Sequence, residues 1–176
     1  AARTATTMPT PDFPGNSFGQ GKNVPAIAMA HGIPYVATAT VADLHDLERK
    51  VRYAMSFHGA RYIHILVPCP LGWGAPSAKT IELARLAHET GLFPVFEAEY
   101  GEVTNVSKIR RKQPVEKYLM LQKRFAHLFG KKGNPEIVQR MQALADRNIA
   151  RYGLLGDEQG DDIPVPEQAE ERHHVI

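Results

Sequence analysis

The chain has 176 residues, of which 43% are hydrophobic and 23% are charged, and these values are typical of a globular protein with one core. Its 21 Lys and Arg residues against 19 Asp and Glu residues leave a formal net charge of +2, which gives no reason to expect a nucleic-acid partner. The longest apolar runs, such as residues 62–70, have the length of a strand and are far too short to span a membrane.

Cys69 is the only cysteine of the sequence, so an internal disulfide is impossible, and no secretory leader opens the chain. These two observations predict a protein of the reducing cytoplasm. The basic side chains are scattered apart from one cluster at residues 108–112. That cluster is either a docking point for an acidic electron carrier or part of a solvated loop.

The first elements follow an irregular opening. Residues 1–24 are rich in Thr, Pro, Gly and Asn, and they predict a loop that wraps a ligand or a neighbour. Pro25 begins a short helix that ends at Gly32, and residues 35–39 predict a strand. Apolar residues at spacings of three and four then predict an amphipathic helix over residues 41–57.

The middle of the chain continues this alternation. A nearly continuous apolar run over residues 61–67 predicts a strand covered on both faces, and a helix over residues 78–89 follows with Ser77 as its cap. Because the order strand, helix, strand, helix implies parallel strands with right-handed crossovers, we expect the α/β class with a parallel sheet. Two short strands around Gly101 come next, within residues 93–106.

The last part of the chain is helical and then polar. Pro114 and Pro135 each begin a further helix, the first through about residue 129, and the polar residues 153–176 predict an arm that lies on a partner or is disordered. The chain therefore divides into residues 1–130, which hold the sheet, and residues 131–176, which hold the C-terminal helix and an acidic arm.

The loop Pro68-Cys69-Pro70-Leu71-Gly72-Trp73-Gly74 is the most informative stretch. It lies just past the carboxyl end of a predicted strand, where α/β sheets place their ligands. Two prolines fix the turn around the cysteine, and two glycines let the chain pass close to a bulky object. These features suit a ligand of a metal cluster, but a small buried residue in a tight loop would also explain Cys69.

Other roles for polar residues find less support. A catalytic thiol would need a base, and His64 lies five positions from Cys69 along a strand, on the opposite face. A zinc site would need further Cys or His at ligand spacing, and the eight histidines form no such pair. The hydroxyl-rich opening at residues 3–7 lacks a Gly-rich phosphate loop. A cluster completed by cysteines elsewhere stays open, because this chain supplies one of the four thiolates that such clusters need.

Three stretches together resemble the β subunit of 2-oxoacid:ferredoxin oxidoreductases, the family of pyruvate:ferredoxin oxidoreductase. They are His-Gly-Ile-Pro-Tyr-Val-Ala-Thr at residues 31–38, the loop at residues 68–74, and Pro-Val-Glu-Lys-Tyr-Leu-Met-Leu-Gln from residue 114, followed by Arg124-Phe125 and His127-Leu128. The likeness covers about residues 1–152, in the family's order and spacing, and the acidic tail has no counterpart.

This resemblance implies the C-terminal part of a thiamine diphosphate-binding fold, in an enzyme that acts only as part of a multisubunit complex. Such an enzyme decarboxylates a 2-oxoacid, passes electrons singly through [4Fe–4S] clusters to ferredoxin or a similar acceptor, and transfers the acyl group to coenzyme A. The implied partners are the other subunits, or the missing N-terminal half of the same chain.

The resemblance also implies where the cofactors are bound. Thiamine diphosphate and Mg²⁺ are held mainly by a Gly-Asp-Gly motif and an Asn that lie, with three cluster cysteines, upstream of where this chain begins. The fourth cluster cysteine falls at Cys69. Thr4 and Thr6 match a hydroxyl-rich stretch just after the metal-binding loop, and we expect them beside the cofactor and the substrate pocket.

Several questions stay open from sequence. The substrate is pyruvate or a larger branched or aromatic oxoacid, because the pocket is shared with another subunit. A second hypothesis is a non-catalytic assembly module that docks partners, with Cys69 buried as a small apolar residue. A third is a stand-alone thiol enzyme, which lacks a base to activate Cys69.

Overall fold

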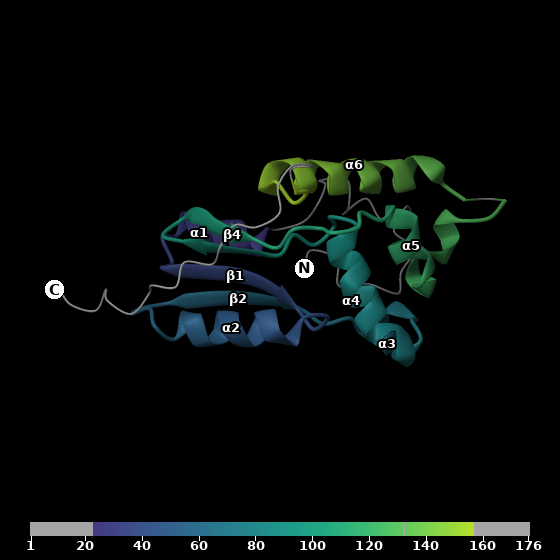
Figure 1. Cartoon of the computed structure of the whole chain (residues 1–176). Helices are drawn as coiled ribbons and strands as arrows, with labels where there is room; N and C mark the ends of the chain where they lie inside the picture. The colour runs from purple at the N-terminus through teal and green to yellow at the C-terminus, as the bar shows by residue number, and fades with distance from the viewer. Residues whose placement is uncertain (1–22, 132, 157–176) are drawn as a thin grey trace.

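A computed structural model describes residues 23–131 and 133–156 of the chain. Its strands are β1 (Tyr35–Thr40), β2 (Arg61–Leu66), β3 (Phe96–Glu99) and β4 (Glu102–Val106). Its α-helices are α1 (Val24–Ala30), α2 (Leu44–Ala54), α3 (Pro70–Trp73), α4 (Thr80–Glu89), α5 (Val115–Met120) and α6 (Pro135–Tyr152). Two 3₁₀ helices, η2 (Ser77–Lys79) and η3 (Lys123–Leu128), complete these elements. The α/β class that the sequence predicts is confirmed (Figure 1).

Polar side chains fix where the longer helices begin. Asn23, Asp43 and Asn134 accept the backbone N–H three residues further on, at 3.1, 2.9 and 3.3 Å, and so cap α1, α2 and α6. Pro25 and Pro135 stand in the first turns of their helices, as predicted. The cap predicted at Ser77 is wrong, because Ser77 opens η2 and α4 begins only at Thr80.

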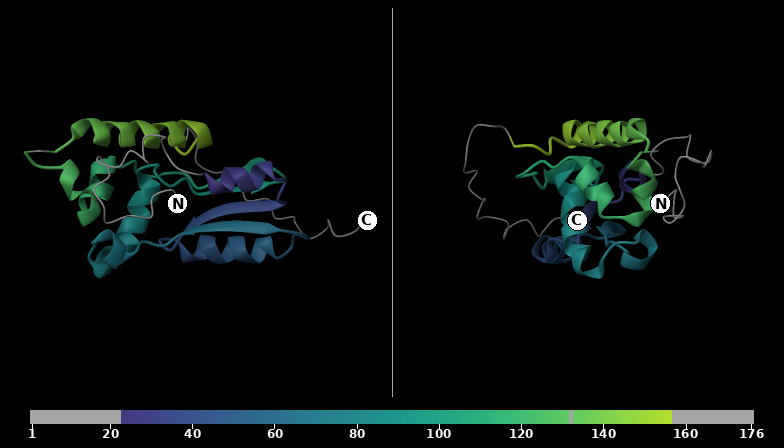
Figure 2. Two further views of the ribbon diagram at one scale, coloured as in Figure 1. Left: turned by 180° about the vertical axis from the view of Figure 1, so that it is seen from behind. Right: turned by 90° about the vertical axis from the view of Figure 1, so that its right-hand side faces the viewer.

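The four strands form a mixed sheet in the order β2-β1-β3-β4. β1 and β2 run parallel, as the sequence predicts, whereas β3 runs antiparallel to β1 and forms a hairpin with β4. The reason is the position of α4, which lies beyond the carboxyl ends of β1 and β2 and does not run back along the sheet (Figures 1 and 2). The chain therefore re-enters the sheet at the carboxyl end of β1, where the Thr38 hydroxyl accepts the Phe96 N–H at 2.9 Å.

β2 is an edge strand of the described sheet and pairs there with β1 alone. The prediction that this strand is covered on both faces is wrong for the described chain, because the Ile65 side chain is 39% exposed and Val67, just after the strand, is 58% exposed. No second neighbour stands beside β2 among the described residues, so its apolar side chains stay open on that side. An apolar edge of this kind is open to pairing with another strand.

Helices cover both faces of the sheet. Tyr35 of β1 packs with Ala54 of α2 on one face, and Val36 packs with Ala28 of α1 on the other, because successive side chains of a strand point to opposite faces. α6 runs along the same side as α1 (Figure 2), and its Tyr152 stacks on Phe96 with ring centroids 4.8 Å apart.

A larger core lies beyond the carboxyl ends of β1 and β2. It is built by α4, α5, η3 and α6, and includes Leu83, Leu119, Leu128 and Ala145. The single helix predicted from Pro114 to about residue 129 is wrong, because the backbone is extended at Gln122, between α5 and η3. The Gln122 side chain donates to the Tyr118 carbonyl at 2.7 Å, and so occupies an acceptor that the next helical turn would use.

The region boundary predicted at residue 130 stays a prediction, because no observation tests it.

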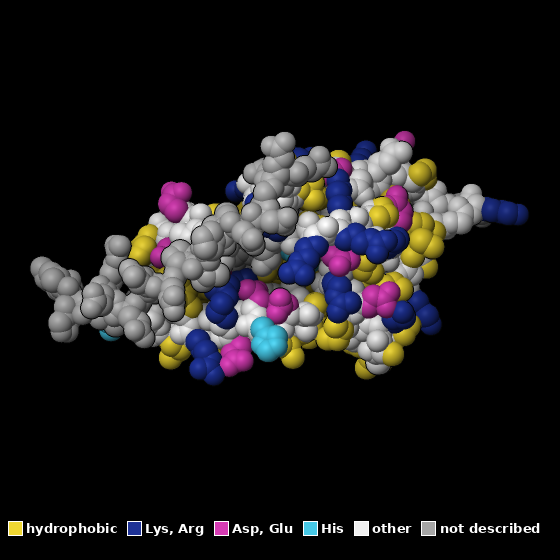
Figure 3. All heavy atoms as spheres, viewed as in Figure 1, with side chains coloured by type: hydrophobic (Ala, Val, Ile, Leu, Met, Phe, Trp, Pro, Cys, Tyr) yellow, Lys and Arg dark blue, Asp and Glu magenta, His cyan; other side chains and the backbone are white. Residues whose placement is uncertain are grey.

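Among the described residues, no helix is both long enough and apolar enough to cross a bilayer. Figure 3 shows Lys and Arg side chains gathered over the half of the molecule that holds α4 and α5, with Asp and Glu side chains between them.

Candidate functional site

Cys69 follows the carboxyl end of β2 and caps α3, a single helical turn. Its backbone is extended (φ −102°, ψ 104°), and Pro70 stands in the first turn of the helix. The Cys69 carbonyl accepts the Trp73 N–H at 3.0 Å, and the Cys69 Sγ accepts the Gly72 N–H at 3.3 Å. The thiol is thus fixed at the edge of the sheet by its own turn.

The exposure of Cys69 bears on two hypotheses about it, a cluster ligand and a small buried residue. The thiol is free and exposed in the described chain, so none of the described residues buries it as the assembly-module alternative expects. Hydrogen bonds to the sulfurs are common around iron–sulfur clusters, and the Gly72 N–H makes one to Cys69 Sγ. Cys69 therefore fits the role of a cluster ligand.

A complete metal site is not present in the described part of the chain, which holds no group of three or more His, Cys, Asp or Glu side chains placed to bind a metal ion. Cys69 fits as one ligand of a cluster whose other thiolates come from elsewhere. Thr4 and Thr6, the predicted cofactor contacts, lie outside the described residues.

His64 lies in the sheet and not beside the thiol. Its ring meets the Phe93 ring edge to face at 5.7 Å, and its Nδ1 atom is buried without a hydrogen bond. Burial lowers the pKa of His64 below its usual value of 6.5. These contacts indicate that His64 packs against Phe93 and does not act as a base for the Cys69 thiol.

Residues 118–125 hold the loop that carries Cys69. The Gly74 carbonyl accepts the Lys123 N–H at 3.2 Å, which ties the end of α3 to the start of η3. Gly74 has a left-handed backbone (φ 63°), and a Cβ added there would come within 2.7 Å of the Lys123 Cβ. Glycine is the residue that adopts a left-handed backbone without strain and leaves room for the Lys123 side chain, which explains why a glycine stands at position 74.

Arg124 makes the second contact between these segments. Its guanidinium carbon lies 4.1 Å from the centre of the Trp73 ring and 4.6 Å from the centre of the Phe125 ring. Arg124 Nε donates to the Gln122 side chain at 2.8 Å, and Gln122 is 1% exposed. Burial lowers the pKa of the Arg124 guanidinium, and Tyr118 partly opposes that effect. The structure thus joins two stretches of the family resemblance, the loop at 68–74 and the run from residue 114.

The role of Arg124 is not readable from sequence. Arg124 stands beside Phe125, which hints at a cation–π contact, but its shorter contact is with Trp73, 51 residues earlier in the chain. That pairing depends on how η3 packs against α3, which no local pattern encodes.

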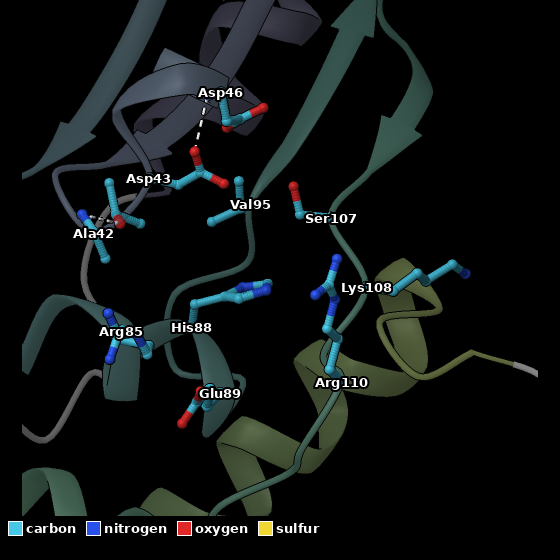
Figure 4. A pocket seen from close by; sticks show the side chains of 11 residues that line it. Ala42, Asp43, Asp46, Arg85, His88, Glu89, Val95, Ser107, Lys108 and Arg110 are labelled. Atoms are coloured by element: carbon cyan, nitrogen blue, oxygen red, sulfur yellow. Dashed lines mark hydrogen bonds between the residues drawn. The ribbon is translucent and has the colours of Figure 1, made fainter. Parts of the chain in front are cut away.

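A polar cavity of about 530 Å³ lies beside the carboxyl end of β1 (Figure 4). Arg85, His88 and Glu89 of α4 line one wall, and Arg110 and Asp43 stand on others. Burial lowers the pKa of His88, which keeps its ring neutral at pH 7. Basic and acidic side chains both line the cavity, so it favours neither anions nor cations. Sequence analysis does not predict it, because its walls come from four separate segments.

The basic cluster at residues 108–112 is partly tied to α6 and the residue after it. Lys108 Nζ donates to the Gly153 carbonyl at 2.7 Å, and Lys112 Nζ lies 2.7 Å from an Asp146 carboxylate oxygen. The bond from Lys112 holds the pKa of Asp146 below its usual range. Arg110 and Arg111 remain exposed.

Comparison with known proteins finds similar chains over most of this sequence. A pyruvate synthase subunit PorB of Methanosarcina barkeri is 49% identical over 141 residues, which is 78% of this chain and 48% of the relative. The PorB subunit of Pyrococcus furiosus is 36% identical over 181 residues, 93% of this chain and 52% of the relative. A ketoisovalerate oxidoreductase subunit VorB of Pyrococcus abyssi is 42% identical over 121 residues, 68% of this chain and 38% of the relative. No protein-family model matches the chain.

The chain spans about half the length of the curated relatives that it matches over most of its own length. The identities, from 36% to 49% for the two PorB relatives, confirm the resemblance drawn from the sequence. The chain is therefore a homologue of the PorB and VorB subunits of 2-oxoacid oxidoreductases, and it corresponds to about half of such a subunit.

Proposed function

We propose that the chain is part of a thiamine diphosphate- and iron–sulfur-dependent 2-oxoacid oxidoreductase, in which Cys69 is one ligand of a [4Fe–4S] cluster. The observation that carries the proposal is the exposed Cys69 thiol at the carboxyl edge of the sheet, in a loop fixed by prolines and by the contact of Gly74 with Lys123. The whole enzyme converts a 2-oxoacid and coenzyme A to acyl-CoA and CO₂, and two electrons leave one at a time.

This chain contributes only part of the cofactor machinery. Thiamine diphosphate, when bound with Mg²⁺, supplies the carbanion chemistry of decarboxylation, and residues upstream of this chain bind most of it. Thr4 and Thr6 are proposed to contact the cofactor or the substrate from this side. Cys69 keeps a thiolate at the cluster, and its turn orients the sulfur.

The rest of the subunit is the first partner of this chain. The relatives are about twice as long as the matched region, and one edge of β2 has no partner strand among residues 23–131 and 133–156, with exposed Ile65 and Val67 beside it. A further strand along that edge would cover these side chains and satisfy the open backbone groups. We propose that the unmatched half of the subunit supplies this strand.

Other partners follow from the same activity. The electron acceptor is ferredoxin or a similar carrier, and exposed Arg110 and Arg111 offer it a basic surface. The region boundary at residue 130 is kept as a proposal, with α6 packed against α4 and α5 in one core, and the end of the chain is proposed to form an arm on a neighbouring subunit. The cytoplasm suits this enzyme, because a reducing compartment keeps the free thiol of Cys69 available.

The substrate is proposed to be pyruvate or a branched-chain oxoacid. The relatives carry the names of pyruvate synthase and of ketoisovalerate oxidoreductase, and they match this chain at comparable identity.

A substrate-dependent reduction of the native complex tests this function. Pyruvate or 2-oxoisovalerate is added with coenzyme A, without dithionite, and the iron–sulfur signals are recorded by low-temperature electron paramagnetic resonance. The proposal predicts that one of these oxoacids reduces a cluster and that Cys69→Ser removes that signal, while Ser77→Ala, a change at an exposed position with no side-chain bond to Ser77 Oγ, preserves it.

The assembly-module alternative predicts the opposite result. Cys69→Ser would leave the iron–sulfur signals and their reduction by oxoacid unchanged. That outcome would mean that Cys69 only supports the structure of the loop and that the chain is a non-catalytic module that docks partner subunits.

A further inference from the structure

Arg124 is a half-buried cation without an anionic partner among the described residues. It contacts the neutral Gln122 side chain, the Trp73 and Phe125 rings, and Tyr118, whose pKa is raised by burial so that it stays neutral. No Asp or Glu of the described chain forms an ion pair with it. A buried charge is costly unless an opposite charge lies near, so this arrangement points to an anion outside the described chain.

The position of Arg124 indicates which anion would lie near its guanidinium. Its guanidinium stacks on Trp73, the last residue of α3, and Trp73 donates its N–H to the carbonyl of Cys69, the cap of the same helix. The cation therefore lies against the turn that presents the thiol. A [4Fe–4S] cluster with four thiolate ligands is anionic, and one-electron reduction adds a further negative charge.

The immediate surroundings hold Arg124 in place. Gln122 accepts from Arg124 Nε and donates to the Tyr118 carbonyl, so the guanidinium is anchored to the backbone of α5 by a buried amide. The Trp73 and Phe125 rings lie against the guanidinium, and Arg124 is only partly exposed, so solvent screens its charge less than that of a fully exposed arginine. A fixed cation in a poorly screened position acts on a neighbouring redox centre more strongly than an exposed one.

We propose that Arg124, held by its stack on Trp73, is a positioning residue that places a permanent positive charge beside the cluster bound by Cys69. This charge stabilises the reduced cluster relative to the oxidised one and so raises its reduction potential. The inference rests on the proposed function, because it requires the cluster.

Potentiometric titration of the native complex, followed by electron paramagnetic resonance, tests this inference. Arg124→Gln is expected to shift the midpoint potential of the Cys69-dependent signal to a more negative value, with iron content unchanged. Arg124→Lys, which keeps the charge, is expected to restore most of the potential. Arg140→Gln, the same change at an exposed arginine of α6, is expected to have no effect.

The outcomes separate the two proposals. An unchanged midpoint potential in Arg124→Gln, with the cluster intact, would overturn the role of Arg124 and leave Cys69 as a ligand. A wild-type complex without any Cys69-dependent signal would overturn the proposed function itself.

A second variant covers the case in which Arg124→Gln does not assemble. Trp73→Leu removes the ring on which the cation stacks but keeps an apolar side chain at that position. It is expected to shift the potential in the same negative direction, because the guanidinium then moves toward solvent. A cluster with the wild-type potential in Trp73→Leu would contradict the inference.

Discussion

Arg49 of α2 and Glu97 of β3 form an ion pair that joins the helix to the sheet, with Arg49 Nη2 2.6 Å from Glu97 Oε1. The Glu97 side chain is 4% exposed and also accepts from the Tyr35 hydroxyl at 2.6 Å and from Asn105 at 2.9 Å. Burial alone would raise the pKa of Glu97, but these three donors lower it below its usual value. The carboxylate is thus satisfied inside the fold and fixes α2 against the sheet.

Arg49→Met is expected to destabilise the protein by about 2 kcal/mol, because it removes one donor from a buried carboxylate that keeps two others. Arg52→Met is the matched control, since Arg52 pairs with Glu48 on the surface and its loss is expected to cost less than about 0.5 kcal/mol. Urea unfolding of the full-length subunit measures both. Equal losses of unfolding free energy in the two variants would mean that the Arg49–Glu97 pair stabilises the fold no more than the surface pair of Arg52 and Glu48.

The stability that Glu97 contributes should depend on pH. Its folded pKa lies below the ordinary value of 4.5, so its contribution is present above about pH 4.5 and is lost as the pH falls through the folded pKa. We expect the free energy of unfolding of the wild type to exceed that of Glu97→Gln by about 1.5 kcal/mol at every pH between 7 and 5. This difference is expected to shrink at lower pH. Unfolding curves across this range provide the measurement. A gap that widened on acidification would contradict the assigned direction.

Gly74→Ala should disturb the loop that carries Cys69. The new Cβ would lie 2.7 Å from the Lys123 Cβ in a left-handed backbone, whereas Gly32→Ala, at a similar φ of 68°, meets no atom within 4 Å. Both changes carry backbone strain of about 1 kcal/mol, and only Gly74→Ala adds a collision. We expect Gly74→Ala to lower the iron content of the complex and Gly32→Ala to preserve it. Loss of iron in both would assign the effect to general destabilisation.

The open edge of β2 gives a prediction about the full-length subunit. Ile65→Lys is expected to destabilise it by about 3 kcal/mol or to prevent its assembly, because the side chain that is 39% exposed here would be covered by the rest of the subunit. Val51→Lys on α2 is the control, with a side chain 43% exposed and an expected effect within about 0.5 kcal/mol. Thermal unfolding compares the two. A tolerated Ile65→Lys would show that nothing covers this edge.

Much of the fold can be predicted from local patterns. Pro25 and Pro135 mark the starts of α1 and α6, and periodicity locates α2 and α4 to within a few residues. The direction of β3 cannot be predicted in this way, because it depends on where α4 packs. The break at Gln122 depends on a side-chain hydrogen bond to Tyr118 that competes with the helix.

Local sequence patterns likewise predict one part of the candidate site and not the other. Prolines and glycines around Cys69 predict a rigid loop at the sheet edge, and the structure places Cys69 there, at the start of the one-turn helix α3. The exposed edge of β2 was not predicted, because an apolar strand looks the same whether its neighbour belongs to the described chain or to another segment. The contact of Arg124 with Trp73 joins residues that are distant in sequence, and only the packing of η3 against α3 brings them together.

The most direct test of the central claim is the iron and acid-labile sulfide content of the purified native complex, compared between wild type, Cys69→Ala and Ser77→Ala. If Cys69 is a cluster ligand, Cys69→Ala will lose iron and sulfide equivalent to one [4Fe–4S] cluster per subunit, about four atoms of each, and Ser77→Ala will keep the full content. A Cys69→Ala complex with the same iron and sulfide as wild type would show that the thiol holds no cluster.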